Sequence, residues 1–158
     1  KSFGKKSFAL IDLGCKFEGY CSDITRMFFI NSDSMVNYYY KKLCELQKKL
    51  ISMCVVGRKV SEIDFFAKKF CKNIGVEKNY LHSTGHGVGL EVHEIPRISF
   101  RDKTVLKEGM VITIEPGIYF SKDFCLPKSF NNKNLWNFGL RVEDMVLITK
   151  KGHKVLTR

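Results

Sequence analysis

Five side chains able to bind a metal ion interrupt segments that otherwise look buried: Asp12, Asp23, His86, Glu115 and Glu143. Carboxylates on interior strand faces repel one another and lose hydration, so a group of four requires compensating positive charge. Two divalent ions would balance the four carboxylates, and a neutral His86 would complete the ligand set. Because two ions about 3.5–4 Å apart can hold a hydroxide and polarise a carbonyl, the pattern predicts metal-assisted hydrolysis.

A ligand set rich in oxygen, with one imidazole, suits Mn²⁺ as the expected metal, with Co²⁺, Fe²⁺ or Zn²⁺ as alternatives. Taken singly, these residues have ordinary structural interpretations: Asp12 as a strand-end residue, His86 as a hydrogen-bonded core histidine and Glu115 as a turn residue before Pro116–Gly117. The case for metal therefore depends on all five together.

The two aspartates require a β-hairpin to position them. Alternating apolar residues predict strands over residues 8–13 and 20–30, joined by a four-residue turn at 16–19 that ends in glycine. That turn places Asp12 directly opposite Asp23, on one buried face of the hairpin.

Two helices are expected after the hairpin. Apolar residues at spacings of three and four predict a first helix with Ser32 or Asp33 as N-cap and Gly57 as its stop. A second helix is expected from Ser61, with Ser61 and Asp64 as an approximate capping box and Gly75 at its end. Its apolar stripe, like that of the first helix, is interpreted as core: Ile63, Phe66, Phe70 and Ile74.

Strands are expected again in the second half of the chain. Residues 110–115 and 140–149 have strand patterns, and residues 121–138 are interpreted as a long exposed loop. Strands, then helices, then strands predict an α+β domain. A chain of 158 residues is long enough for one such domain with its own core.

Composition limits the classes of partner and compartment. The net charge of +11 comes from basic residues spread along the chain, as in the Lys41–Lys42, Lys48–Lys49 and Lys68–Lys69 pairs, so we interpret it as a solvated surface and expect no nucleic-acid partner. No apolar run approaches 18 residues, so no membrane partner is expected. Six cysteines without paired spacing suit a reducing compartment, and we expect the cytoplasm.

Six motifs in chain order resemble those of the pita-bread metallopeptidases, the creatinase/aminopeptidase family: IDLG (11–14), GYCSDITR (19–26), GHGVG (85–89), EVHE (91–94), TIEPG (113–117) and GLRVED (139–144). The resemblance implies a pita-bread fold, an antiparallel curved sheet with helices on its outer face. It also implies ligand roles: Asp12 for one metal ion, His86 and Glu115 for the other, and Asp23 and Glu143 as bridges.

The resemblance assigns further roles around the metal ligands. Glu115 would also act as general base toward the attacking water. His93 would contact the substrate's peptide group and stabilise the tetrahedral intermediate, and His82 would line the pocket or move a proton. Arg141, next to the metal carboxylates, would supply positive charge close to the substrate.

Asp144, Arg26 and the segment Leu90–Glu91–Val92–His93 resemble the proline-specific branch, Xaa-Pro dipeptidase (prolidase) or aminopeptidase P. Asp144 follows Glu143 where methionine aminopeptidases typically have His–Thr, and Arg26 follows Asp23–Ile24–Thr25. A proline-containing peptide is therefore the expected substrate. A methionine aminopeptidase and a non-catalytic pita-bread module that binds proteins or nucleic acid are the alternatives.

The resemblance also has consequences for domain organisation. Asp12 comes close to the start of the chain, so residues 1–158 are expected to be the C-terminal part of a metallopeptidase catalytic domain that is N-terminally truncated, without any N-terminal domain. We expect a homodimeric parent protein. Lacking one wall of the cleft, these residues alone are expected to bind metal weakly and to be inactive.

Overall fold

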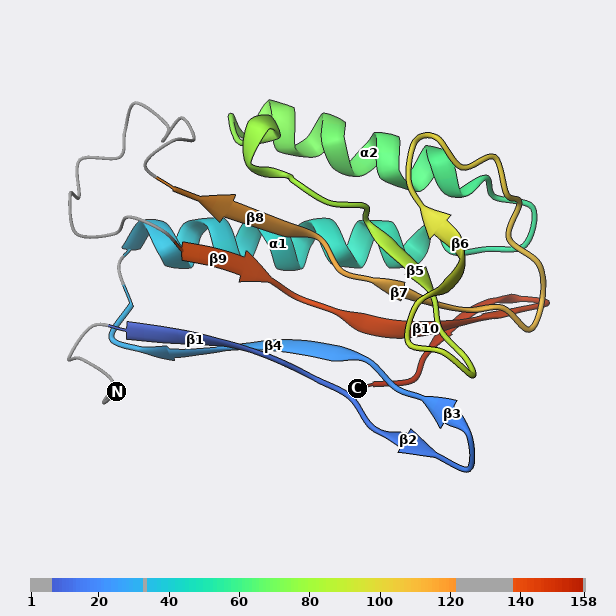
Figure 1. Ribbon diagram of the computed structural model, residues 1–158. Coiled ribbons are helices and arrows are strands. Elements are labelled where there is room, and N and C mark those ends of the chain that lie inside the picture. The colour runs from blue at the N-terminus through green and yellow to red at the C-terminus, as the bar shows by residue number, and fades with distance from the viewer. Residues whose placement is uncertain (1–6, 33, 122–137, 158) are drawn as a thin grey trace.

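The computed structural model describes residues 7–32, 34–121 and 138–157. The order of elements follows the predicted α+β sequence of hairpin, helices and further strands (Figure 1). The helices are α1 (Ser34–Ser52), α2 (Val60–Asn73) and the short 3-10 helix η1 (Glu77–Asn79). The strands are β1 (Ser7–Leu13), β2 (Lys16–Phe17), β3 (Tyr20–Cys21), β4 (Ile24–Ile30), β5 (Gly85–Gly87), β6 (Glu94–Ile98), β7 (Val111–Ile114), β8 (Gly117–Phe120), β9 (Phe138–Arg141), β10 (Asp144–Thr149) and β11 (Gly152–Val155).

The hairpin forms as predicted, but its register differs. Strands β1 and β4 pair antiparallel with Asp12 opposite Thr25, not opposite Asp23. The reason is the turn: Phe17 pairs with Tyr20, leaving a two-residue turn in place of the expected four-residue one. Both of its residues, Glu18 (φ 49°) and Gly19 (φ 88°), have the positive φ that matches the twist of a tight hairpin.

All strand pairs in the described chain are antiparallel, and they form four hydrogen-bonded pieces. The largest has the order β11-β10-β7-β5-β6, and the others are β1–β4, β2–β3 and β8–β9. Backbone bonds join the pieces where the strands bend: Glu143 N–H donates to Thr25 O (3.3 Å) and Val142 N–H to Pro116 O (3.4 Å). The ribbon β1–β4 is thereby held alongside β9 and β10.

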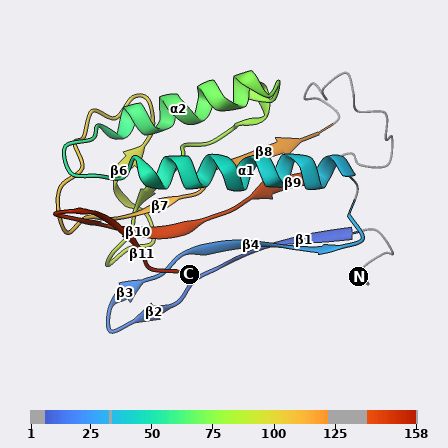
Figure 2. The same ribbon diagram turned by 180° about the vertical axis from the view of Figure 1, so that it is seen from behind.

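The helices lie together on one side of the strands, and the β1–β4 ribbon lies on the other side of β9 and β10 (Figures 1 and 2). The apolar faces of the two helices supply much of the core, which continues into the strands through Ile112, Ile114 and Ile148. Among the described residues, no helix is long and apolar enough to cross a membrane.

Helix α1 carries the expected apolar stripe, with Tyr39, Leu43, Leu46 and Leu50 buried. It ends at Ser52, before the predicted stop; Gly57 (φ 88°) lies in the turn that follows. Asp33, one of the two expected N-caps, lies outside the described residues.

The predicted start of α2 is wrong by one residue, and its capping box is absent. The helix begins at Val60, and its N-cap Lys59 makes no side-chain capping bond. The carboxylate of Asp64 is fully buried and instead accepts hydrogen bonds from Thr84 Oγ1 (2.7 Å) and from the backbone N–H of Phe100 (2.8 Å). A tertiary contact has therefore replaced the expected local one.

The strand predicted over 140–149 is two strands in different pieces of the sheet. Strand β9 pairs with β8, and β10 pairs with β7 and β11, with a break at Val142–Glu143. The break exists because Glu143 turns its backbone N–H to the neighbouring ribbon. Strand β8, directly after Pro116, was not predicted, and most of the loop expected over 121–138 lies outside the described residues.

Candidate metal centre

The five predicted ligands come from five places in the fold and meet at one. Asp12 lies near the end of β1, Asp23 just before β4, His86 in the middle of β5, Glu115 just after β7 and Glu143 just before β10. Their side chains form overlapping groups in which one ligand atom of each residue lies within 4.8 Å of the others. These groups are His86–Glu115–Glu143, Asp12–Asp23–Glu143 and Asp23–His86–His93.

Two glycines allow His86 to reach the centre. A Cβ atom on Gly85 would lie 2.0 Å from Thr113 O, and one on Gly87 would lie 2.4 Å from Ile95 O. The two neighbouring backbone segments therefore approach β5 more closely than any residue with a side chain would allow. His86 itself is buried between them, with its backbone N–H bonded to Thr113 Oγ1 (3.0 Å). The Gly-His-Gly pattern is therefore a packing requirement of the site.

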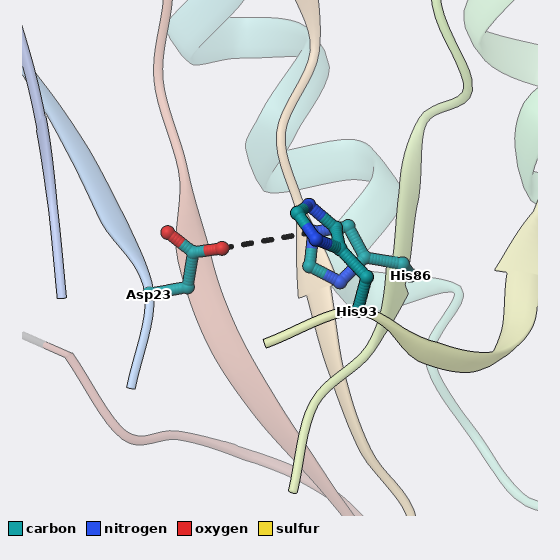
Figure 3. Close-up of side chains that lie close together, drawn as sticks. All are labelled: Asp23, His86 and His93. Atoms are coloured by element: carbon teal, nitrogen blue, oxygen red, sulfur yellow. Dashed lines mark ion pairs between the residues drawn. The ribbon is translucent and has the colours of Figure 1, made fainter. Parts of the chain in front are cut away.

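The imidazole of His86 is oriented for coordination. Its Nδ1 lies 2.9 Å from Gly87 O, and because a carbonyl can only accept, Nδ1 carries the proton and Nε2 presents a lone pair. This Nε2 lies 3.4 Å from Glu115 Oε1 and 3.7 Å from Asp23 Oδ2, as Figure 3 shows for the aspartate. Burial lowers the pKa of His86, which favours the neutral form that a metal requires.

Glu115 and Glu143 are carboxylates placed where charge is costly. Burial, together with repulsion from Glu143, raises the pKa of Glu115 to about 8, and burial raises the pKa of Glu143 to about 7. A hydrogen bond from Thr25 Oγ1 (2.6 Å) opposes the second shift. Burial and the neighbouring Asp12 also raise the pKa of Asp23. Burial therefore favours the protonated forms of Glu115, Glu143 and Asp23 as long as no cation is bound.

Asp12 differs from the other carboxylates. Its side chain is 47% exposed, so the expectation that this carboxylate is buried is wrong. The register of the hairpin moves it away from Asp23 along the strands, yet it remains on the inner face with Thr25. Its Oδ2 accepts a charge-assisted hydrogen bond from Arg141 Nη2, which holds it beside the buried group.

The donor set fits divalent metal ions. Four carboxylates and one imidazole with a free Nε2 lie within reach of shared positions, and burial disfavours their charge unless a cation is added. Oxygen-rich sets of this kind suit Mn²⁺ and related ions better than a structural zinc site. The group Asp23–His86–His93 offers an alternative set of ligands, because His93 lies close enough to Asp23 and His86 to bind the same ion.

The residues expected to contact substrate surround this centre. His93 is exposed and its ring lies 4.4 Å from that of His86 (Figure 3). His82 Nδ1 lies 2.7 Å from Ser83 O and therefore donates to it, so its Nε2 accepts from the Tyr119 hydroxyl (3.0 Å). Arg141 in turn donates from Nη1 to that hydroxyl oxygen (2.8 Å).

Two cavities open on either side of His93. The first, about 630 Å³, is lined by His82, Ser83, His86, His93, Glu94, Ile95, Arg97, Glu115 and Arg141. The second, about 530 Å³, is lined by Asp12, Leu13, Gly14, Cys15, Lys16, Cys21, Ser22, Asp23, Glu91, Val92 and His93. A substrate bound across His93 would have one part in a cavity with two arginines and the other beside the aspartates.

Thr25 and Tyr119 are site residues that sequence reasoning missed. Thr25 accepts from Arg141 Nε (3.1 Å) and donates to Glu143, so it links the arginine to a predicted bridging ligand. Its place in the motif over 19–26 is a signal that could have found it. Tyr119 joins Arg141 to His82, and nothing in its sequence surroundings marks it.

Arg26 and Asp144, the residues that indicated the proline-specific branch, form an ion pair with each other. Arg26 Nη2 donates to Asp144 Oδ1 (2.7 Å), and Gln47 Nε2 donates to Asp144 Oδ2 (3.0 Å). The Asp144 side chain is buried against this pair of donors. The two sequence signals are therefore one structural feature, which fastens β4 to β10 next to Glu143.

Comparison with known proteins is consistent with this geometry. Residues 1–150 match the model of metallopeptidase family M24. An Xaa-Pro dipeptidase of Pyrococcus furiosus is 43% identical over 159 residues, which cover 100% of this chain and 42% of the relative. The chain therefore spans well under half the length of that relative.

Solved structures share the fold. The prolidase from Pyrococcus horikoshii has a TM-score of 0.83 and 43% identity, over 96% of this chain and 40% of that one. The N-terminal domain of FACT complex subunit SPT16 from chickpea has a TM-score of 0.86 at 24% identity, over 99% of this chain and 36% of that one, a likeness of fold alone. The expected pita-bread fold, with antiparallel strands and helices, is thereby confirmed.

Proposed function

The chain belongs to metallopeptidase family M24, and from this premise we propose that its residues form the metal centre of an Xaa-Pro peptidase. The proposed reaction is dinuclear-metal-dependent hydrolysis of the bond between an N-terminal residue and proline, in dipeptides or longer peptides. The observation that carries the proposal is the gathering of five metal-binding side chains with His86 Nε2 directed at two of the carboxylates.

Each ligand has a role in the proposal. Asp12 would hold one ion, His86 and Glu115 the other, and Asp23 and Glu143 would bridge both. When bound, the ions supply Lewis acidity toward the scissile carbonyl and an activated water. Mn²⁺ is the proposed metal, because the donors are mostly carboxylate oxygens.

The remaining steps fall to the chain's own side chains. Glu115 would accept a proton from the attacking water once it is deprotonated, and burial, which raises its pKa, makes that carboxylate a stronger base. His93, exposed between the two cavities, would donate to the oxygen of the tetrahedral intermediate. His82, held by its hydrogen bond with Tyr119, would move a proton or line the first cavity. Arg141, which also contacts Tyr119, would supply positive charge close to the substrate.

Specificity for proline is supported by similarity to proteins named Xaa-Pro dipeptidase and prolidase. Proline has no amide N–H, so its peptide bond offers the site only a carbonyl to bind, and recognition must come from groups around the ring. The first cavity, beside His82 and His93, is the proposed place for that ring. The proposal extends to a homodimer in the cytoplasm, a compartment that suits the free thiols of the five described cysteines.

The test compares substrates and a variant. The full-length parent protein that contains residues 1–158, not these residues alone, is incubated with Mn²⁺ and with Leu-Pro, Leu-Pro-Gly and Met-Ala peptides, and free amino acids are quantified. We expect cleavage before proline that disappears with a chelator and in Glu143→Gln, while Glu62→Gln on the exposed side of α2 serves as the control. Faster cleavage of Met-Ala would reassign the specificity to methionine, and activity insensitive to chelation would overturn the metal centre.

A further inference from the structure

A second feature of the molecule lies away from the metal centre, on the outer side of α2. A cavity of about 570 Å³ is lined by Phe65, Lys68, Lys69, Lys72, Asn73, Glu77 and Phe100. Two of these are large apolar side chains left open to solvent, Phe65 at 63% and Phe100 at 54% exposure. Aromatic side chains placed together in a surface cavity and surrounded by polar residues are typical of a binding site.

The arrangement follows from the helix itself. Phe65, Lys68, Lys69 and Lys72 stand at positions i, i+3, i+4 and i+7, so they share one face of α2, while Ile63, Ala67 and Cys71 form its buried face. Lys68 and Lys72 are neighbours of like charge along this face, an arrangement that destabilises a helix slightly. The sequence thus concentrates positive charge beside an exposed phenylalanine.

The charge on this face is poorly compensated within the chain. Lys68 pairs with the buried carboxylate of Asp64 (2.9 Å). Among the described residues, neither Lys69 nor Lys72 takes part in an ion pair, and Glu77 is the single acid that lines the cavity. The rim would therefore attract an anionic partner.

The environment of Phe100 indicates which kind of anion fits. Lys68 Nζ lies 3.8 Å from the centre of its ring and the guanidinium carbon of Arg101 lies 5.2 Å away. Recognition of nucleic acid on an aromatic platform needs a ring face open to a base, whereas these cations already occupy the surroundings of this ring. Carboxylates can still approach the outer sides of the same cations.

We propose that the cavity beside α2 binds an acidic protein segment that inserts one apolar side chain between Phe65 and Phe100. Its Asp or Glu residues would lie against Lys69 and Lys72, and its apolar side chain would pack against Phe65 and the part of Phe100 that remains exposed beside the cations. The site is built without any metal ligand, so it stands or falls separately from the proposed peptidase activity.

The test is fluorescence anisotropy at low salt with a labelled peptide of Asp and Glu residues around one Leu-Phe pair. The key variant, Lys69→Glu with Lys72→Glu, is matched by Lys41→Glu with Lys48→Glu, which makes the same change of charge on exposed positions of α1. We expect the first pair to weaken binding about tenfold and the matched pair to have little effect. Phe65→Ala should weaken binding about fivefold without lowering the melting temperature, because its side chain is exposed.

Three results would overturn the proposal. Equal losses in the two charge-reversal variants would show that the peptide responds to net charge alone. Binding unchanged by Phe65→Ala would remove the apolar part of the recognition. Tighter binding of single-stranded DNA of matched charge, with the same dependence on Lys69 and Lys72, would assign the face to nucleic acid instead.

Discussion

The two sides of the proposed metal centre are built differently. His86, Glu115 and Glu143 belong to neighbouring strands of the five-stranded sheet, whose far side is covered by helices. Asp12 and Asp23 come from the β1–β4 ribbon, whose outer face is exposed to solvent in the described part of the chain. The sheet positions its ligands through core packing, whereas the ribbon positions Asp12 through contacts across the site, chiefly with Arg141.

The ribbon is apolar on both faces. Its inner face includes Met27, which is 8% exposed, while its outer face leaves Leu13 and Phe28 exposed at 57% and 56%. Of the five proposed ligands, the three on the sheet side and Asp23 are thus largely buried, while Asp12 lies at the surface. On the sheet side, therefore, the main cost is the free energy of burying charged carboxylates. On the ribbon side, the position of Asp12 depends mainly on its contact with Arg141.

The largest effect is expected on the sheet side, from Glu115→Gln. Removing the proposed base and ligand should lower kcat for an Xaa-Pro peptide about a thousandfold. The fold should persist, because at neutral pH the amide replaces a carboxyl group that burial keeps protonated. Steady-state kinetics with Mn²⁺ measure the first effect and urea unfolding the second. Activity within a factor of a few of the wild type would remove Glu115 from the mechanism.

Adjacent residues of β4 test the two faces of the ribbon. Met27→Ala should cost about 2–4 kcal/mol of unfolding free energy, because it leaves a cavity under the ribbon. Phe28→Ala should change stability by no more than about 0.5 kcal/mol, because its side chain is already in solvent. Denaturant unfolding of both variants makes the comparison. Similar losses in the two would mean that something covers the outer face.

The pH dependence of stability should come from the sheet side. In the folded, metal-free chain the pKa values of Glu115 and Glu143 lie above their ordinary value of 4.5, so between about pH 5 and 8 the folded state binds more protons than the unfolded state. The free energy of unfolding should therefore fall across this range as pH rises, by an amount on the order of a few kcal/mol. Urea unfolding with chelator at several pH values tests this, and Glu143→Gln should flatten the curve. Stability that rises toward pH 8 would contradict the assignment.

A small effect on stability is also expected on the ribbon side, from Asp12→Asn. Its partly exposed ion pair with Arg141 should contribute less than about 1 kcal/mol to stability. Metal affinity should fall measurably, since one charged donor is lost. Thermal unfolding and Mn²⁺ titration, with Glu108→Gln at an exposed position as the control, separate the two effects. A loss of stability as large as that of Met27→Ala would show that the pair organises the ribbon.

The chemistry of this site could be predicted further than its geometry. The motifs over 11–26, 85–94 and 113–117 carry the residue types that the chemistry needs, and the α+β order follows from periodicity. The hairpin register was not predictable from the glycine alone, because it depends on Glu18 adopting a positive φ beside Gly19. That single turn decides whether Asp12 faces Thr25 or Asp23.

Other features depend on contacts between distant residues. Asp64 had the spacing of a local cap but bonds to Thr84 and to the backbone of Phe100. The strand over 140–149 breaks because Glu143 bonds to the ribbon, and no local pattern marks that bond. The exposure of the Asp12 side chain likewise depends on which distant segments pack against the ribbon, and the local sequence does not indicate this.

The most direct test of the account is calorimetric titration of the chain with Mn²⁺ at pH 7, in two buffers of different ionisation enthalpy. We expect weak binding of metal by residues 1–158 with release of protons, because Glu115 and Glu143 must lose theirs to coordinate. Proton release should decrease in Glu115→Gln and in Glu143→Gln, while the surface variant Glu62→Gln should match the wild type. Binding without proton release, or binding indifferent to both sheet-side glutamates, would contradict the central claim that these carboxylates form the metal centre.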